Sequence, residues 1–174
     1  MKKSMQYIVM IVYLAIFALI YFSFMARTEA KECSPVPLAS EIVVEKSAKT
    51  MTLYDEMGCK LKEYKVRTGL NKGPKQCEGD KKTPEGIYHV IDKRDSKYVK
   101  FLELDYPRAK DIEQAHKRKC NPGSAIGIHY YNKEYTNDPS TLEGSLGCIT
   151  VWKKSEIEEI NKMVIVGARV VIKP

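Results

Sequence analysis

The chain has 174 residues and a formal net charge of +7, from 29 basic and 22 acidic side chains. This length has room for one domain with an accessory segment. No predicted helix gathers lysines and arginines onto one face with aromatic residues between them, so we expect no nucleic-acid partner. The modest basic excess suits a soluble surface or an anionic polymer as partner.

The N-terminal segment is apolar. Residues 4–26 contain no charged side chain and follow two lysines at positions 2 and 3. About twenty apolar residues span a bilayer, and such lysines hold the N-terminus in the cytoplasm. A cleaved signal peptide has a shorter apolar core and a small-residue cleavage site, for which Thr28-Glu29-Ala30 is a weak candidate. We expect residues 1–30 to be a membrane anchor with one transmembrane helix, or else a signal segment, and residues 31–40 to be a tether.

The cysteines lie beyond this segment, where an exported, oxidising setting permits disulfides. They are Cys33, Cys59, Cys77, Cys120 and Cys148. If Cys148 stays free, the other four allow three pairings, and the sequence does not choose among them. A zinc site is the rival interpretation, but no two cysteines stand two to four residues apart, so we expect no metal.

Short runs of alternating or β-branched residues predict strands along most of the chain. The predicted strands cover residues 41–45, 51–54, 61–66, 87–91, 101–104, 126–128 and 168–172. The first two form a hairpin. Between the third and the fourth, residues 69–86 form a long loop rich in glycine and proline, and loops of this length are usually functional or disordered.

Two helices are expected after this loop. A polar surface helix is predicted over residues 109–119. A second helix begins at Ser155, where Ser155 as N-cap and Glu158 match a capping box, and Gly167 is expected to end it. Many short strands with two helices indicate a mainly β domain over residues 41–174.

One histidine and one cysteine carry the most reactive chemistry in the chain. His129 closes the strand at 126–128, and Cys148 lies among small residues that leave its sulfur accessible. A thiolate is a strong nucleophile, and a nearby imidazole can take the thiol proton to form an ion pair. Taken alone, such a pair is more often structural, so the surrounding motifs decide whether a catalytic role is expected.

Three motifs occur in order along the chain. They are Glu-Gly-Asp-Lys-Lys-Thr-Pro-Glu-Gly-Ile-Tyr at 78–88, Ile-Gly-Ile-His ending at His129, and Ser-Leu-Gly-Cys-Ile at 145–149. Together they resemble the L,D-transpeptidase catalytic domain (the YkuD family) in its compact Gram-negative form, over about residues 40–173. The resemblance implies a β-sandwich-like domain with short helices. It also places the domain in the periplasm, anchored in the inner membrane or secreted.

The resemblance implies a peptidoglycan L,D-transpeptidase with Cys148 as nucleophile and His129 as base, without metal or cofactor. The thiolate would attack a diaminopimelate carbonyl of a stem peptide and release D-alanine. The thioester would then pass to an amine of another stem peptide or of a wall-attached lipoprotein, or to water. Ser145 and Gly147 match the small residues of the cysteine motif, and backbone N–H groups at Gly147 and Cys148 are the expected oxyanion donors.

Three positions depart from the family pattern. Leu146 stands where many members have a second histidine, Tyr130 where many have glycine, and Thr150 where many have arginine. The missing arginine removes a fixed cation, and Tyr130 would place a large ring at the site entrance, where it could contact substrate. These departures keep two alternatives open: a hydrolase of the same fold, trimming stem peptides or releasing wall-bound protein, and a non-catalytic peptidoglycan-binding module. A sortase-like transpeptidase is disfavoured, because that family spaces the pair more widely.

The remaining candidates have mainly structural interpretations. We interpret His89 and His116 as structural and the run 78–86 as architectural. Tyr131 could line a peptide groove. Arg108 and Arg169 are expected to be solvated, although either could bind a stem-peptide carboxylate.

Overall fold

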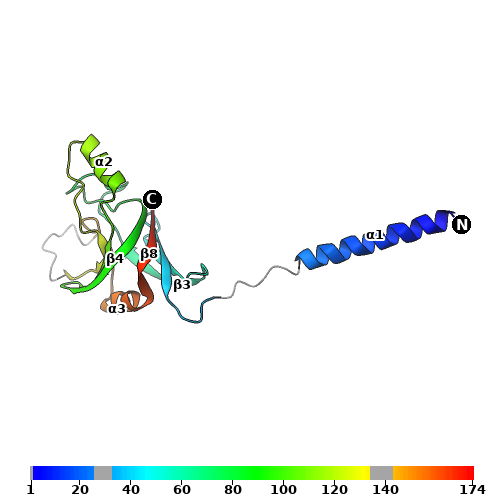
Figure 1. Ribbon diagram of the computed structural model, residues 1–174. Coiled ribbons are helices and arrows are strands. Elements are labelled where there is room, and N and C mark those ends of the chain that lie inside the picture. The colour runs from blue at the N-terminus through cyan, green and yellow to red at the C-terminus, as the bar shows by residue number, and fades with distance from the viewer. Residues whose placement is uncertain (1, 26–32, 134–142) are drawn as a thin grey trace. The chain divides into compact units, whose positions relative to one another are not determined.

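The computed structural model describes residues 2–25, 33–133 and 143–174. The chain divides into two compact units, residues 1–32 and 33–174. The first contains helix α1 (Lys2–Met25), drawn in blue in Figure 1. Among the described residues, no helix is long and apolar enough to cross a membrane. The helix expected in this segment is present, and its role as a membrane anchor stays a prediction.

In the second unit, eight strands close into a barrel in the order β1-β2-β3-β7-β6-β5-β4-β8. The strands are β1 (Ala39–Glu45), β2 (Thr50–Tyr54), β3 (Lys60–Arg67), β4 (Gly86–Ser96), β5 (Val99–Leu104), β6 (Gly127–Tyr130), β7 (Ile149–Val151) and β8 (Val164–Lys173). Strands β3 and β4 each pair with one neighbour along their first part and with another further on. Strands that change sheets in this way turn two sheets into one closed barrel, which leaves no sheet edge.

The core fills the barrel interior. Ile42, Leu53, Val90, Ile128 and Val170 are all 0% exposed and come from five different strands. Helix α2 (Ala109–Lys117) and helix α3 (Lys154–Met163) lie at opposite ends of the strands in Figure 1. The mainly β prediction is confirmed, and the expected sandwich takes the form of a barrel.

The capping box of α3 differs from the prediction. The carboxylate of Glu156, not Glu158, accepts hydrogen bonds from the backbone amides of Trp152 and Lys153, at 3.2 and 3.0 Å. The helix begins before Ser155, so Ser155 lies in its first turn and is not the N-cap. Glu156 is the third helical residue after Lys153, the observed N-cap, and lysine is not a residue type that marks an N-cap in a sequence.

Gly167 does not end α3, as the sequence suggested. The helix ends at Met163, and β8 follows without a loop. Gly167 lies inside β8 with φ +89°, where the register of β8 against β1 shifts. Such a bulge needs a residue that tolerates positive φ, which glycine does without a steric penalty.

The cysteines form two of the possible disulfides. The pairs are Cys33–Cys59 and Cys77–Cys120, and Cys148 is free. The structure thus selects one of the three pairings that the sequence left open. Two disulfides in one small domain are typical of an oxidising compartment.

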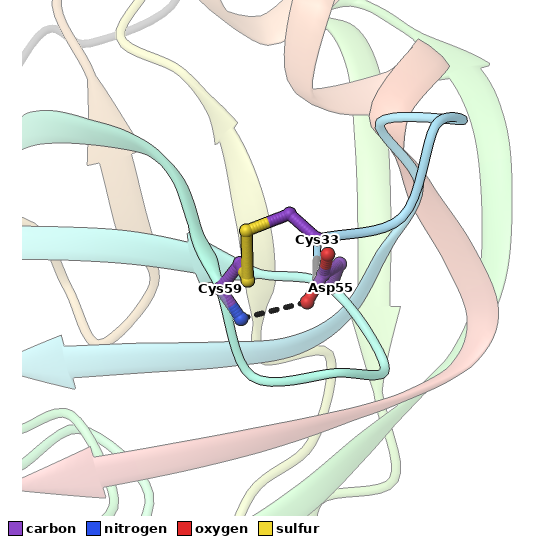
Figure 2. A group of neighbouring side chains, drawn as sticks. All are labelled: Cys33, Asp55 and Cys59. Atoms are coloured by element: carbon purple, nitrogen blue, oxygen red, sulfur yellow. Dashed lines mark hydrogen bonds between the residues drawn. A yellow bond between two sulfur atoms is a disulfide. The ribbon is translucent and has the colours of Figure 1, made fainter. Parts of the chain in front are cut away.

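The Cys33–Cys59 disulfide joins the segment before β1 to the turn between β2 and β3. Asp55 lies beside it, and its carboxylate accepts hydrogen bonds from the amides of Cys59 at 2.7 Å and Ser34 at 2.9 Å (Figure 2). Both sulfurs are used in the disulfide and both carboxylate oxygens have donors. This cluster is therefore a structural staple and not a free set of metal ligands.

Candidate active site

The strands that carry the predicted pair lie side by side. β6 and β7 are parallel neighbours, with Ile128 paired to Ile149 and His129 to Thr150. Cys148 directly precedes β7, two positions before Thr150. Because side chains alternate along a strand, Cys148, Thr150 and His129 share one face. All three line the same cavity of about 520 Å³.

His129 is held as a neutral base. Its ring is 4.1 Å from that of Tyr98 and 5.7 Å from that of Phe101, measured between centroids. Its Nδ1 is 2.8 Å from the carbonyl oxygen of Tyr130. A carbonyl only accepts, so Nδ1 carries the proton and Nε2 keeps its lone pair. Burial lowers the pKa of His129 to about 4, with the charge of Arg67 adding to the effect and the Tyr130 carbonyl opposing it.

Cys148 rests as a thiol. Burial raises its pKa to about 11, although the Gly127 amide and the charge of Lys75 act in the opposite direction. Its Sγ lies 3.5 Å from the carbonyl oxygen of Ala125. These pKa shifts favour a thiol and a neutral imidazole at rest, whereas the ion pair expected from the sequence stays a prediction. Both groups lie where desolvation disfavours charge.

The turn that presents Cys148 is closed by Ser145. Its Oγ accepts a hydrogen bond from the Gly147 amide at 3.1 Å and donates one to the Cys148 carbonyl. Gly147 has φ +142°, which favours glycine. The Gly147 N–H is therefore committed inside the turn. Of the two expected oxyanion donors, only the Cys148 N–H has no such commitment to Ser145.

Tyr130 does not place its ring in the cavity. It alternates with His129 along β6, and its ring packs against the barrel core. What Tyr130 brings to the site is its main-chain carbonyl, bonded to His129. Tyr131, one residue further, lines the cavity in its place. The aromatic residue that lines this cavity after His129 is therefore Tyr131 and not Tyr130.

The sequence does not identify Arg67 as a site residue. It ends β3 and pairs with Thr150 of β7, which in turn pairs with His129 of β6. The three residues form one row across three neighbouring strands. Arg67 is only 3% exposed. A fixed cation thus stands beside Thr150, the position where the family pattern led us to expect its loss.

Arg67 also connects the segments that build the site. Its guanidinium donates a hydrogen bond to the carbonyl of Gly144, at the start of the cysteine turn. Its Cζ lies 3.8 Å from the ring centroid of Tyr131 and 5.0 Å from that of Trp152, which follow β6 and β7. Nothing in a local pattern marks this arginine, because its role depends on strands far apart in sequence.

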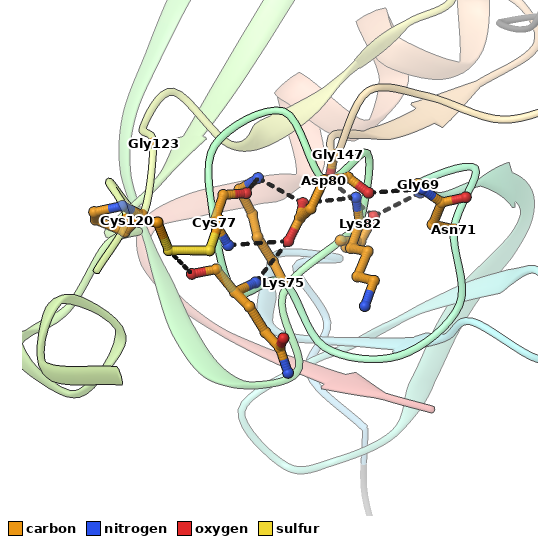
Figure 3. Close-up of polar contacts among 12 residues, drawn as sticks. Gly69, Asn71, Lys75, Cys77, Asp80, Lys82, Cys120, Gly123 and Gly147 are labelled. Atoms are coloured by element: carbon orange, nitrogen blue, oxygen red, sulfur yellow. Dashed lines mark hydrogen bonds and ion pairs between the residues drawn. A yellow bond between two sulfur atoms is a disulfide. The ribbon is translucent and has the colours of Figure 1, made fainter. Parts of the chain in front are cut away.

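Loop 69–86 contributes residues to the cavity lining and is ordered by the partly buried carboxylate of Asp80. The donors to Asp80 are the amides of Gln76, Cys77 and Lys82 and the Nζ of Lys75 (Figure 3). The Cys77–Cys120 disulfide ties the loop to the segment that leads into β6. Lys75, Glu78 and Gly79 of this loop line the cavity together with residues 123–126. The loop is therefore functional in position, although it contains no helix or strand.

The other candidates lie elsewhere. His89 Nδ1 is 3.4 Å from the Asp105 carboxylate, and His116 lies on α2. Arg108 donates to a main-chain carbonyl, and Arg169 pairs with Glu41. None of these histidines and arginines lines the catalytic cavity.

A closed barrel thus brings the free cysteine Cys148 and the histidine His129 into one cavity. The family model for the YkuD L,D-transpeptidase catalytic domain matches residues 39–172. The chain belongs to the YkuD family, as the three motifs predicted.

Relatives and solved structures agree with this family. The chain is 33% identical over 99 residues to "Putative L,D-transpeptidase YafK" of Escherichia coli (strain K12), covering 52% of this chain and 40% of that protein. The helical cell shape determining protein Pgp2 from Campylobacter jejuni superimposes with a TM-score of 0.61 at 22% identity, covering 80% and 52% of the two chains. An Enterococcus faecium L,D-transpeptidase with a cysteine replaced by serine gives 0.52 at 21%, covering 78% and 50%. At these identities, the solved structures show the fold alone. The chain spans about half the length of these two solved chains and less than half the length of YafK.

Proposed function

We propose that the protein is a peptidoglycan L,D-transpeptidase that works through a thioester on Cys148. The observation that carries this proposal is the register of β6 and β7, which brings a free thiol and a neutral imidazole into one cavity. The family to which the chain belongs acts on peptidoglycan stem peptides. No metal or cofactor enters the proposed chemistry.

The proposed reaction has two halves. In the first, Nε2 of His129 takes the thiol proton while Sγ of Cys148 bonds to the carbonyl carbon of a diaminopimelate residue. The Cys148 N–H stabilises the negative charge that develops on the carbonyl oxygen. The C–N bond then breaks, and D-alanine leaves with the proton from His129. In the second half, an acceptor amine attacks the thioester and Cys148 departs as the thiol.

The acceptor decides between transfer and trimming. An amine of a second stem peptide, or of a wall-attached lipoprotein, gives a crosslink, whereas water gives a shortened stem peptide. Both outcomes share the same acyl-enzyme. Leu146, 58% exposed, lies on the cavity lining next to Cys148, where it can exclude water from the thioester. This placement favours transfer.

The test follows products from defined muropeptides. The full chain is incubated with tetrapeptide-stem muropeptides, and the products are identified by mass spectrometry. We expect crosslinked dimers and free D-alanine, both abolished by Cys148→Ala. Trimmed monomers alone would instead identify a hydrolase. Binding without any turnover would contradict enzymatic function and leave a binding module.

We further propose that the domain works outside the cytoplasm, held at the inner membrane or released into the periplasm. The uncharged run at 4–26 and the two disulfides support this proposal. Cell fractionation with protease treatment of spheroplasts tests it. A protease-sensitive domain outside the inner membrane is expected, and a reduced, protease-protected cytosolic chain would contradict it.

A further inference from the structure

Thr83 lies beneath the cysteine turn and touches both the turn and the start of its own loop. It is 0% exposed. Its Oγ1 accepts a hydrogen bond from the Gly69 amide at 2.7 Å and donates one to the Gly147 carbonyl at 2.8 Å. Its two partners, Gly69 and Gly147, are labelled in Figure 3. A hydroxyl has one proton, so donation to Gly147 leaves its lone pairs for Gly69.

This hydrogen bond fixes the plane of the peptide between Gly147 and Cys148. In a trans peptide, the carbonyl and the N–H point in opposite directions. The Gly147 carbonyl is held on the side of Thr83, so the Cys148 N–H points to the opposite side. Ser145, Leu146 and Cys148 line the cavity, whereas Gly147 does not. The Cys148 N–H is therefore directed toward the cavity.

The turn has little room to rotate away from this arrangement. A Cβ added at Gly147 would lie 3.0 Å from the Lys82 carbonyl oxygen, and one at Gly69 would lie 2.5 Å from that of Lys81. The loop and the cysteine turn are thus packed backbone against backbone, with the Thr83 hydroxyl between them. Since Ser145 already holds the Gly147 amide, the Cys148 amide is the donor that this packing leaves for a ligand.

We propose that Thr83 is a positioning residue for acyl transfer, whose hydroxyl aims the Cys148 N–H at the oxygen that becomes negatively charged. The inference rests on the proposed function and adds a residue to it. Thr83 does not touch the substrate and acts only through the Gly147–Cys148 peptide. Removing one oxyanion donor lowers kcat by about 10²–10³ in a well-studied protease. A donor that is misaimed and not removed should lower acylation by at least about tenfold.

Two reactions of the same sulfur separate this role from a general structural one. A carbapenem acylates Cys148 through a tetrahedral oxyanion, whereas iodoacetamide alkylates it by displacement at a saturated carbon and develops no oxyanion. Thr83→Val keeps the shape of the side chain and removes the hydroxyl. In the full chain we expect this variant to acylate at least about tenfold more slowly, with alkylation within about twofold of the unmodified chain. Thr83→Ser keeps the hydroxyl and should restore acylation.

The outcomes are distinct. Acylation and alkylation that fall together in Thr83→Val would overturn the inference, because the turn itself would then be disrupted. Unchanged acylation would also overturn it. Thr83→Ala, compared by the same ratio of rates, replaces the valine variant if the latter does not fold. An unmodified chain that is alkylated at Cys148 but never acylated would contradict the proposed function, and the inference would fail with it.

Discussion

The protons of the resting site are placed by burial. With the pKa of Cys148 raised to about 11 and that of His129 lowered to about 4, the proton stays on sulfur at neutral pH. A buried thiolate–imidazolium pair would need partners for both charges, and burial here opposes both. In the proposed reaction, His129 therefore removes the thiol proton during attack. The bond from its Nδ1 to Tyr130 fixes the tautomer that this step needs.

This proton distribution predicts two different pH profiles. Carbapenem acylation should persist across neutral pH and fall as pH drops through about 4, because protonated His129 cannot accept the thiol proton. Iodoacetamide alkylation lacks that concerted base step, so it should rise tenfold per pH unit until the thiol titrates near 11. Both rates are measured by intact-protein mass spectrometry. An alkylation plateau below pH 7 would show a preformed thiolate and contradict this description.

The charge of Arg67 should help to set the pH at which acylation falls on the acidic side of that profile. Burial is the larger cause of the low pKa of His129, and the charge of Arg67 adds to it. Arg67→Met should therefore move the fall in acylation to higher pH, and Arg67→Lys should largely prevent this movement because it keeps the charge. The pH dependence of carbapenem acylation checks both variants.

Lys46→Met is the matched control for Arg67. Lys46 is another buried cation, and it holds Gly73, Thr83 and Glu85 without lining the catalytic cavity. Because Lys46 also contacts the Thr83 carbonyl, its loss should lower the melting temperature and slow acylation at every pH, but the pH at which acylation falls on the acidic side should not change. A fall that moves equally in pH in Lys46→Met and Arg67→Met would show that the effect comes from destabilisation and not from charge.

At the scale of elements, the site depends on two walls joined by a disulfide. Cys77 lies in loop 69–86 and Cys120 precedes the segment leading to β6, so their bond holds the two sides of the cavity together. The Cys33–Cys59 bond joins residues 26 positions apart, at the turn between β2 and β3, whereas Cys77–Cys120 joins residues 43 positions apart. None of the four disulfide cysteines lines the catalytic cavity.

Removing each disulfide should therefore have different consequences. Replacing either pair with serines should destabilise the domain by about 2–4 kcal/mol. Only the loss of Cys77–Cys120 should also slow acylation beyond the effect on stability, since it frees the wall that carries Lys75. Thermal unfolding and acylation rates at a temperature where both variants are folded check this. Equal acylation in the two variants would contradict the positioning role of this disulfide.

The elements were predicted to different extents. Strands β1 to β5 follow alternating runs that a sequence displays directly, and the β1–β2 hairpin is confirmed. Strand β7 has three residues, Ile149–Val151, which are too few for a periodic signal, so it was missed. That omission matters, because the parallel pairing of β6 with β7 is what aligns Cys148 with His129.

Individual site residues divide in the same way. Cys148 and His129 stand in motifs with recognisable chemistry, so sequence reasoning found them. Arg67 and Thr83 act through contacts with segments about 60 to 80 residues away in sequence, to Gly144 and Gly147. Such contacts exist only once the barrel has closed. No local pattern indicates Arg67, and Thr83 stands in the motif at 78–88, which we interpret from the sequence as architectural.

At the scale of the whole molecule, the barrel holds in place the few strand ends and loops that form the site. The site uses the C-terminal ends of β3 and β6, the start of β7 and the loops that follow β3 and precede β6. Closure depends on β3 and β4, which change partners along their length. The sequence predicted the class of fold, because alternation marks half-buried strands, but it did not show where the sheets join.

The central claim is that Cys148 forms a covalent acyl-enzyme with a stem peptide. The most direct measurement is the intact mass of the full chain after acid quenching of a reaction with a tetrapeptide-stem muropeptide, followed by mapping of the modified peptide. We predict an adduct that lacks the terminal D-alanine, maps to Cys148, is absent in Cys148→Ala and forms far more slowly in His129→Gln. An adduct that survives Cys148→Ala, or turnover that persists in that variant, would contradict the claim.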